Sequence, residues 1–325
     1  MVEELPRDDE NLLNQIPEDE ALPEGHKSGF VAVIGRPNVG KSTLMNVILG
    51  EKIAIVSPKP QTTRFRQLGI YTRPDAQIVF IDTPGLHEPR TKLGEYMVSV
   101  AVEALRDADV ILWVVDASEP PTAEDRRIAE HITEAGDQTP VVLVLNKADR
   151  VKDEGQLRAH RAAFEELAPV ARVAETVATQ AVGVPELVET LVELLPEGPR
   201  YYPADQLSDT ALRDIVAEII REKALLNLEQ EVPHGIATQV EEFKQRNENL
   251  TYIAATIYVE RESHKGIVIG KGGQMLKRIS QQSREEIERL LGTRVYLELW
   301  VKVLKHWRKN ESALRRLGYR LPKRK

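Results

Sequence analysis

From about Lys27 to Leu195, short apolar runs alternate along the chain with amphipathic segments. This alternation is typical of a mostly parallel β-sheet that is covered by helices. The apolar runs predict strands, and the segments with apolar residues at helical spacing predict helices. The predicted strands are 31–34, 78–81, 110–115, 141–145 and 170–177, and the predicted helices lie near 44–49, 94–107, 121–135, 153–167 and 184–195.

The pattern changes after a segment that is rich in proline and glycine. These residues, Pro196, Gly198, Pro199 and Pro203, predict a linker over 197–208. Asp209 is then expected to cap a helix that continues to about Leu226, and period-two alternation predicts strands over 235–243, 251–260 and 294–303. We therefore expect an α/β domain at 27–196 and an α+β domain at 209–325.

The net charge of −7 is unevenly distributed along the chain. Between Arg261 and Lys325 there are 18 basic and 6 acidic residues, a net of +12, which leaves −19 for the other 260 residues. A basic end on an acidic body predicts that the C-terminal domain contacts phosphate groups. Residues 1–26 are rich in acidic residues and contain prolines, so a disordered extension is expected there.

Two absences narrow the class of protein. The chain has no cysteine, which excludes disulfides, thiolate metal sites and thiol nucleophiles and fits a reducing cytoplasm. No apolar run approaches the roughly 18–20 residues that a membrane-spanning helix needs, and the acidic N-terminus is unlike a secretory signal. A soluble cytoplasmic protein is expected.

A glycine-rich segment joins the first predicted strand to the first predicted helix. Its residues, Gly35, Arg36, Pro37, Asn38, Val39, Gly40, Lys41, Ser42 and Thr43, have the spacing of a P-loop in the strand–loop–helix context that this motif requires. Backbone N–H groups of such a loop point at a polyphosphate, and the helix N-terminus adds positive potential. Lys41 is expected to contact the outer phosphates and Ser42 to ligate Mg²⁺. The sequence predicts a nucleoside triphosphate site.

A second motif follows the strand at 78–81 and consists of Asp82, Thr83, Pro84 and Gly85. A carboxylate at the end of such a strand reaches Mg²⁺ through water, and the glycine N–H can bond the γ-phosphate. Loss of that phosphate would release the loop, so this segment is predicted to be a switch.

The third motif, Asn146, Lys147 and Asp149, follows the strand at 141–145 and identifies the base. The Asp149 carboxylate can accept two hydrogen bonds from guanine, whereas adenine would leave it unpaired. Asn146 is expected to brace the base and the P-loop, and the stem of Lys147 to cover the purine. GTP is therefore the predicted ligand.

With these three motifs the chain resembles a translation-factor-type GTPase, and the run 57–64 is similar to the effector loop of the Era family of GTPases. The resemblance implies switch I at Gln61, Thr62, Thr63 and Arg64, with one threonine closing on Mg²⁺; Thr63 is favoured over Thr62. It also implies that Ala178 and Thr179 occupy the place of the family's Ser-Ala pair, where a backbone N–H meets the guanine oxygen.

Leu86 ends switch II at the position where Ras-like enzymes carry a water-orienting glutamine. An apolar side chain cannot orient water, so other groups must organise the attack. Asn38 resembles an asparagine that helps to hold a monovalent cation in related GTPases. K⁺ at this position is therefore a hypothesis for the missing positive charge, and slow intrinsic GTP hydrolysis is expected.

In the second domain, Gly270, Lys271, Gly272 and Gly273 form a G-x-x-G loop between the apolar run 267–269 and a predicted helix. Such a loop lets the backbone approach single-stranded nucleic acid, as in a KH domain, and the order of elements resembles the type II KH fold. Lys277 and Arg278 lie close by and complete the predicted RNA-binding set. Trp300 and Trp307 are expected to pack in the core rather than to stack on bases.

The resemblance to the Era family covers about Gly29 to Tyr319. It implies a monomeric assembly GTPase that binds the 3′ region of 16S rRNA through its KH domain, acts in maturation of the 30S subunit and associates peripherally with the inner membrane. A signalling GTPase whose basic tail binds lipid or a protein partner is the alternative. The direction of coupling between nucleotide and RNA stays open.

Overall fold

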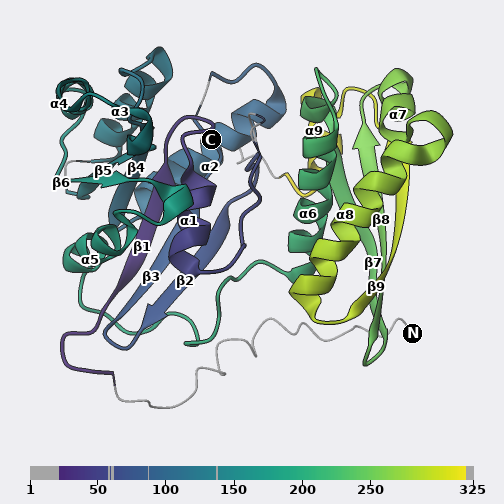
Figure 1. Cartoon of the computed structure of the whole chain (residues 1–325), viewed down its shortest axis with the longest axis horizontal. Coiled ribbons are helices and arrows are strands. Elements are labelled where there is room, and N and C mark those ends of the chain that lie inside the picture. Colours follow the sequence, from purple (N-terminus) through teal and green to yellow (C-terminus); the bar gives the residue numbers. More distant parts are fainter. Residues whose placement is uncertain (1–21, 58, 60–61, 87, 137, 320–325) are drawn as a thin grey trace, which may run out of the picture.

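The computed structural model describes residues 22–57, 59, 62–86, 88–136 and 138–319. Within them the chain forms one six-stranded sheet and one three-stranded sheet, each covered by helices, and the two units lie side by side (Figure 1). The predicted fold class is confirmed. The expected acidic extension at 1–26 falls almost entirely outside the described residues, as do Pro58, Pro60 and Gln61 of the effector loop and Arg320 to Lys325.

The six-stranded sheet has the order β2-β3-β1-β4-β5-β6. Its five predicted strands are present and pair in parallel, and they are β1 (Lys27–Ile34), β3 (Ala76–Asp82), β4 (Val110–Asp116), β5 (Val141–Asn146) and β6 (Arg172–Thr176). An additional edge strand, β2 (Gln67–Arg73), pairs antiparallel with β3 and was not predicted. The carboxyl ends of the parallel strands therefore meet at one edge of the sheet.

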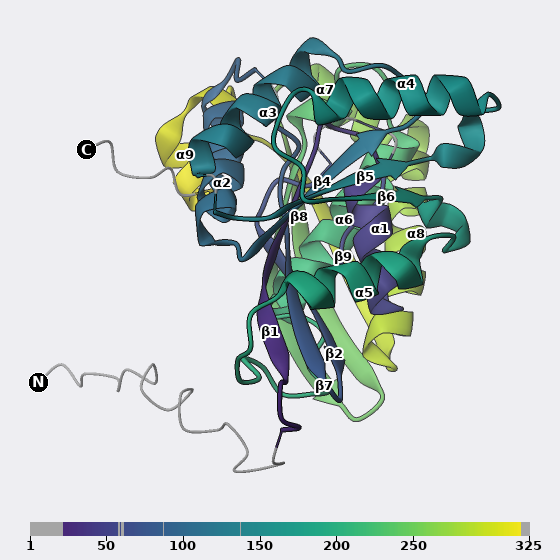
Figure 2. The same ribbon diagram turned by 90° about the vertical axis from the view of Figure 1, so that its left-hand side faces the viewer.

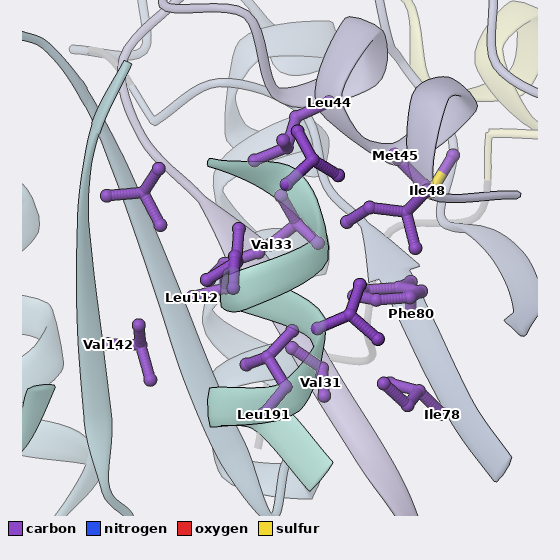
Figure 3. Close-up of a cluster of buried hydrophobic side chains, with 14 of the residues drawn as sticks. Val31, Val33, Leu44, Met45, Ile48, Ile78, Phe80, Leu112, Val142 and Leu191 are labelled. Carbon is purple, nitrogen blue, oxygen red and sulfur yellow. The ribbon is translucent and has the colours of Figure 1, made fainter. Parts of the chain in front are cut away.

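Helices cover both faces of this sheet (Figure 2). They are α1 (Lys41–Leu49), α2 (Lys92–Asp107), α3 (Ala123–Ala135), α4 (Glu154–Glu165) and α5 (Val184–Leu194). Leu44 and Met45 of α1 and Leu191 of α5 pack on Val33 and Phe80 of the sheet in one buried cluster (Figure 3). Helices α2, α3 and α4 bury their apolar residues on the opposite face. The core thus fixes where α1, and with it the P-loop, begins.

The predicted linker does not run free, because it packs along one end and the β2 edge of the six-stranded sheet. The Gln77 side chain accepts hydrogen bonds from the backbone N–H groups of Tyr201 and Tyr202 at 2.8 and 3.0 Å. Further along, the N–H of Ile70 in β2 donates to the carbonyl of Leu207. The linker is thus hydrogen-bonded to the sheet of the first domain.

The second unit has the sheet order β7-β8-β9. It consists of α6 (Leu212–Asn227), β7 (Ala237–Asn247), β8 (Leu250–Val259), α7 (Glu262–Ile269), α8 (Gln274–Leu291), β9 (Arg294–Val303) and α9 (Glu311–Arg316). The prediction that Asp209 caps the first helix is wrong, since Ala211 precedes α6 and provides no side-chain cap. The apolar run 267–269 is the end of α7, and Gly235, the first residue of the predicted strand 235–243, lies in a short 3-10 turn.

Candidate functional site

The predicted nucleotide motifs line one cavity of about 550 Å³ at the carboxyl edge of the six-stranded sheet. The P-loop forms one side, and the loops that follow β3, β5 and β6 form the rest. Its lining residues are Pro37, Asn38, Gly40, Lys41, Ser42, Thr43, Ile55, Val56, Ser57, Thr62, Thr63, Gly85, Asn146, Lys147, Asp149, Arg150, Val177, Ala178 and Thr179.

The P-loop turns tightly between β1 and α1. Gly35 and Gly40 have φ angles of 151° and 107°, and Asn38 also has a positive φ, of 66°. A Cβ on Gly40 would lie 2.3 Å from the amide nitrogen of Asn146, so this close approach requires glycine. The buried Lys41 Nζ donates to the carbonyls of Gly35 and Arg36, both at 3.0 Å. Burial lowers the pKa of Lys41 to about 8.

Three oxygen-bearing side chains meet where α1, switch I and β3 converge. Ser42 Oγ and Thr63 Oγ1 donate to Asp82 Oδ2 at 2.9 and 3.2 Å, and the two hydroxyls lie 3.1 Å apart. Among the described residues Asp82 Oδ1 is buried without a hydrogen-bonding partner, and burial raises the pKa of this carboxyl. Hydroxyl and carboxylate oxygens are ligands that Mg²⁺ prefers, so this set fits that ion.

The two threonines of switch I differ in their contacts. Thr62 Oγ1 donates to the carbonyls of Ser57 and Lys59, within its own loop, whereas Thr63 Oγ1 reaches Asp82. This geometry favours Thr63 as the side chain near the metal, and its role stays a prediction.

Switch II begins at the end of β3 and lies against β1 and the P-loop. Thr83 Oγ1 donates to the Val33 carbonyl at 2.8 Å, and a Cβ on Gly85 would come within 2.8 Å of the Pro37 nitrogen. Leu86 is 4 % exposed and packs with the cluster under α2 and α3, outside the residues that line the nucleotide cavity. Its side chain therefore contributes to the core.

The Asn146 side chain links two of the loops that line the cavity. Its amide nitrogen donates to the Val39 carbonyl at 2.8 Å, and its Oδ1 accepts from Thr176 Oγ1 and from the Ala178 N–H. Asn146 therefore ties the P-loop to the loop after β6, as its expected bracing role requires. Because the Ala178 N–H is already engaged, Thr179 is the better candidate for a backbone contact with a purine oxygen.

The Lys147 side chain reaches from the loop after β5 to the P-loop and to the end of β4. Its Nζ donates to the Asn38 carbonyl and to Asp116 Oδ2, both at 2.7 Å. Burial opposes ionisation of Asp116, but hydrogen bonds from Lys147 and Ser118 outweigh it and lower the pKa of this carboxyl. Sequence reasoning missed Asp116, although its place at the end of β4 could have suggested it. Asp149 lies exposed at the rim, in the turn that follows Lys147.

The G-x-x-G loop lies between α7 and α8. Gly270, Gly272 and Gly273 have φ angles of 74°, 59° and 78°, and a Cβ on either of the last two would meet nothing within 4 Å. The loop is therefore open to a ligand on its outer side. The cations next to it, Lys271, Lys277 and Arg278, are all exposed.

Helix α6 of the second domain contacts switch I directly. Its buried Arg221 donates to the Thr62 carbonyl and to Glu218, and the Val56 N–H donates to Glu222 at 2.8 Å. Lys52 adds an ion pair with Glu222 at 2.6 Å. The sequence carried no motif for these contacts, which join Thr62 of switch I and the segment that precedes the switch to the three-stranded domain.

Arg64 and Phe65 extend this contact into a cluster of aromatic rings. Arg64 is 1 % exposed, donates to the Ile236 carbonyl at 2.5 Å and lies 5.7 Å above the ring of Trp307. The Phe65 ring stacks on Tyr319 with a centroid distance of 4.5 Å. Trp307 is fully buried, which confirms its predicted packing, but Trp300 is 55 % exposed, so the same prediction is wrong for Trp300.

The fold and the site together define a P-loop GTPase domain joined to a KH domain. Residues 30–147 match a family model described as 50S ribosome-binding GTPase, and residues 231–308 match the KH domain model. The chain is 50 % identical over 295 residues to GTPase Era of Alkaliphilus metalliredigens, covering 90 % of this chain and 99 % of the relative. It is 52 % identical over 302 residues to GTPase Era of Caldicellulosiruptor saccharolyticus, covering 91 % and 98 %. The chain therefore belongs to the GTPase Era family.

Solved structures agree with this assignment. A structure of Era in complex with MgGDPNP and nucleotides 1506–1542 of 16S ribosomal RNA superposes with a TM-score of 0.86 at 42 % identity, covering 91 % of this chain and 99 % of that one. An Aquifex aeolicus Era variant bound to GDP·AlF4⁻ gives the same TM-score and identity, covering 91 % and 100 %.

Proposed function

We propose that the protein is a ribosome assembly factor that binds and hydrolyses GTP and binds the 3′ region of 16S rRNA through its KH domain during 30S maturation. The proposal rests on one observation: the same chain holds a cavity lined by Ser42, Thr63 and Asp149 and an open G-x-x-G loop, and the domain of that loop contacts switch I. Relatives bound to MgGDPNP, GDP·AlF4⁻ and 16S nucleotides support it.

In the nucleotide site, the backbone of Gly35 to Thr43 binds the phosphates and Lys41 neutralises their charge. Ser42 and Thr63 ligate Mg²⁺, and Asp82 holds it through water; the ion supplies charge stabilisation at the β- and γ-phosphates. A water molecule bound to Mg²⁺ would give the buried Asp82 Oδ1 a hydrogen-bonding partner. At the other end, Asp149 accepts hydrogen bonds from guanine while Asn146, Lys147, Ala178 and Thr179 frame the base. GDP binding by Asp149→Ala, measured in competition with ADP, tests the assignment: preserved guanine preference refutes it.

Hydrolysis must proceed without a side chain at Leu86 that orients water, because this residue is packed in the core. We therefore retain the hypothesis that Asn38 helps to hold K⁺ beside the phosphates, where positive charge stabilises the transition state. Single-turnover hydrolysis should be faster in K⁺ than in Na⁺, and Asn38→Ala should remove the difference. Equal rates in both salts refute the role of K⁺.

RNA binding is assigned to Gly270, Lys271, Gly272 and Gly273, with Lys277 and Arg278 contacting phosphate. Gly272→Asp places a charge and a strained residue in this loop, since Gly272 has a φ of 59°. Binding of single-stranded RNA should be lost, whereas GDP binding should be unaffected. Retained RNA affinity would refute the assignment. The affinities are measured with a GTP analogue and with GDP, which also gives the direction of coupling.

The domain division proposed is 27–196, 197–208 and 209–325, with an acidic extension at 1–26. Expression of 27–196 with the packed linker should give a fragment that binds GDP, and a fragment that fails to bind GDP refutes the division. We propose that the full chain is a monomer, which its mass in solution tests.

The alternative is a signalling GTPase whose basic tail binds membrane lipid or a protein partner. No helix of the described residues could span a bilayer. The basic residues near the G-x-x-G loop favour RNA, and the proposed location is cytoplasmic. Peripheral association with the inner membrane is tested with anionic vesicles: vesicle binding that survives Gly272→Asp together with unchanged RNA binding would favour the alternative.

A further inference from the structure

The outer face of the three-stranded sheet carries exposed aromatic rings. Strands β8 and β9 place alternate apolar residues against α6 and α8, so the intervening side chains point to the opposite side. On this side Tyr296 is 62 % exposed and Trp300 is 55 % exposed. Exposed apolar side chains that gather on one face, rather than lying singly, are typical of a surface for a partner.

The two tyrosine rings on this face contact each other and their neighbours. Tyr252 and Tyr296 are paired across the strands, with ring centroids 5.9 Å apart and planes 20° apart. Arg246 lies over the Tyr252 ring at 4.9 Å, and the Tyr252 hydroxyl donates to Glu298 at 2.7 Å. Because these contacts already position the two tyrosine rings, stacking of a base on them would require little further loss of conformational entropy.

Basic side chains frame the rings. Lys244 and Arg246 belong to β7, and Arg294 and Lys302 belong to β9. Three carboxylates share this side: Glu298 accepts from the Tyr252 hydroxyl, Glu241 pairs with Lys302 at 3.2 Å, and Glu242, opposite Ala254 in the strand register, is exposed. The face thus combines flat apolar rings with positive charge, which is the chemistry of single-stranded nucleic acid recognition.

We propose that this aromatic sheet face, made of Tyr252, Tyr296 and Trp300 with Arg246 and Lys302, stacks bases of the RNA segment that continues beyond the G-x-x-G groove. The inference rests on the proposed RNA binding.

Strand β9 connects the helix side of the sheet with its outer face, and this supports an RNA path from the G-x-x-G groove to the exposed rings. β9 is one of the two edge strands, and its Leu297 and Leu299 lie on the side of α8 while Tyr296 and Trp300 lie on the outer side. In Figure 1, β8 and β9 lie beside α8 on the flank away from the six-stranded domain. An RNA strand that leaves the groove over this edge therefore meets the rings next. Stacking tolerates any base, so this face adds affinity and length dependence rather than sequence specificity.

Tryptophan fluorescence gives a direct test because the chain has three tryptophans, and Trp113 and Trp307 are fully buried. Quenching of the exposed indole therefore reports on Trp300. Two single-stranded RNAs from the 3′ end of 16S rRNA are compared, one of about four nucleotides, the length that a KH groove clamps, and one of about twelve. The longer RNA should quench the fluorescence of the full chain, and Trp300→Phe should abolish the quenching. No quenching at saturating long RNA overturns the proposal.

Affinities of the same RNAs provide the second test. Trp300→Ala and Tyr296→Ala should each weaken binding of the longer RNA roughly tenfold and leave the shorter RNA unaffected, since one stacked base is lost. Trp300→Phe, which keeps a ring, should restore most of the affinity. Tyr201→Ala is the matched control, because Tyr201 is an exposed ring on the linker.

The outcomes separate this inference from the proposed function. If the short RNA binds and Gly272→Asp abolishes its binding, RNA binding in the groove is established. If the double variant Tyr296→Ala/Trp300→Ala then binds the long RNA as well as the wild type does, the inference about the sheet face is overturned and the proposed function is not. If neither RNA binds the wild-type chain, both fail. Binding of anionic vesicles that depends on Trp300, with RNA binding independent of it, overturns the inference in favour of a membrane surface.

Discussion

Arg64 is the residue whose loss should most weaken the link between the nucleotide and the KH domain. It directly follows Thr63, and its buried guanidinium donates to the carbonyls of Ile236 and His234 at 2.5 and 3.3 Å and lies over Trp307. Arg64→Ala would leave two carbonyls of the second domain without their partner and remove the cation from the ring. Switch I would then lose the contacts of this side chain with that domain, while the hydrogen bond from Arg221 to the Thr62 carbonyl would remain.

The magnitude follows from the contacts. A hydrogen bond to a charged group contributes about 1.5–3 kcal/mol, and a desolvated cation–π contact about 2 kcal/mol. Burial of the guanidinium opposes both, and it lowers the pKa of Arg64. A net loss of about 3 kcal/mol is expected, which corresponds to a roughly 150-fold shift in the docking equilibrium of the two domains.

The assay is the ratio of RNA dissociation constants measured with a GTP analogue and with GDP. If docking transmits the state of switch I, this ratio should approach one in Arg64→Ala. Arg66→Ala is the matched control, because Arg66 is an exposed arginine that pairs with Asp107 of its own domain at 3.2 Å. Retained GDP binding shows that the first domain is folded. An unchanged ratio in Arg64→Ala would refute a coupling that runs through this residue.

The remaining predictions concern stability and the surface part of the interface. Asn146→Ala removes three buried hydrogen bonds, so the free energy of unfolding should fall by about 2–4 kcal/mol and GDP affinity should drop; thermal unfolding with and without GDP measures both. Leu86→Gln puts a polar amide at a position that is 4 % exposed and should lower the melting temperature without accelerating single-turnover hydrolysis; faster hydrolysis would contradict the packing argument. Lys52→Ala should change the nucleotide-dependent RNA ratio by less than about fivefold, because Lys52 is 42 % exposed and its ion pairs are screened.

The parallel strands and the nucleotide motifs could be predicted because both are local in sequence. A strand buried on both faces is a continuous apolar run, and the P-loop spacing is fixed by the phosphates it surrounds. β2 escaped prediction because Gly69 interrupts its pattern; the reason for this glycine is tertiary, since a Cβ there would lie 2.6 Å from Leu49. A single sequence does not reveal that neighbour.

Residues that act between domains could not be predicted for the same reason. Arg221 and Glu222 lie in an ordinary amphipathic helix, and only the docked arrangement aligns them with the backbone of switch I. Trp300 was assigned to the core from its residue type. Its position alternates with Leu299 and Val301, however, which already places it on the outer face of β9.

The stacking of Phe65 on Tyr319 has a consequence for the order in which the protein is made. These rings meet in the folded chain but are separated by most of its length, so at about 5–20 residues per second roughly 10 s or more pass between their syntheses. During this time the first domain can fold and bind nucleotide, while Phe65 and Tyr96 still lack their aromatic partner. A nascent chain therefore passes through a stage in which all residues of its GTP site have been made but the aromatic contact between its two domains has not yet formed.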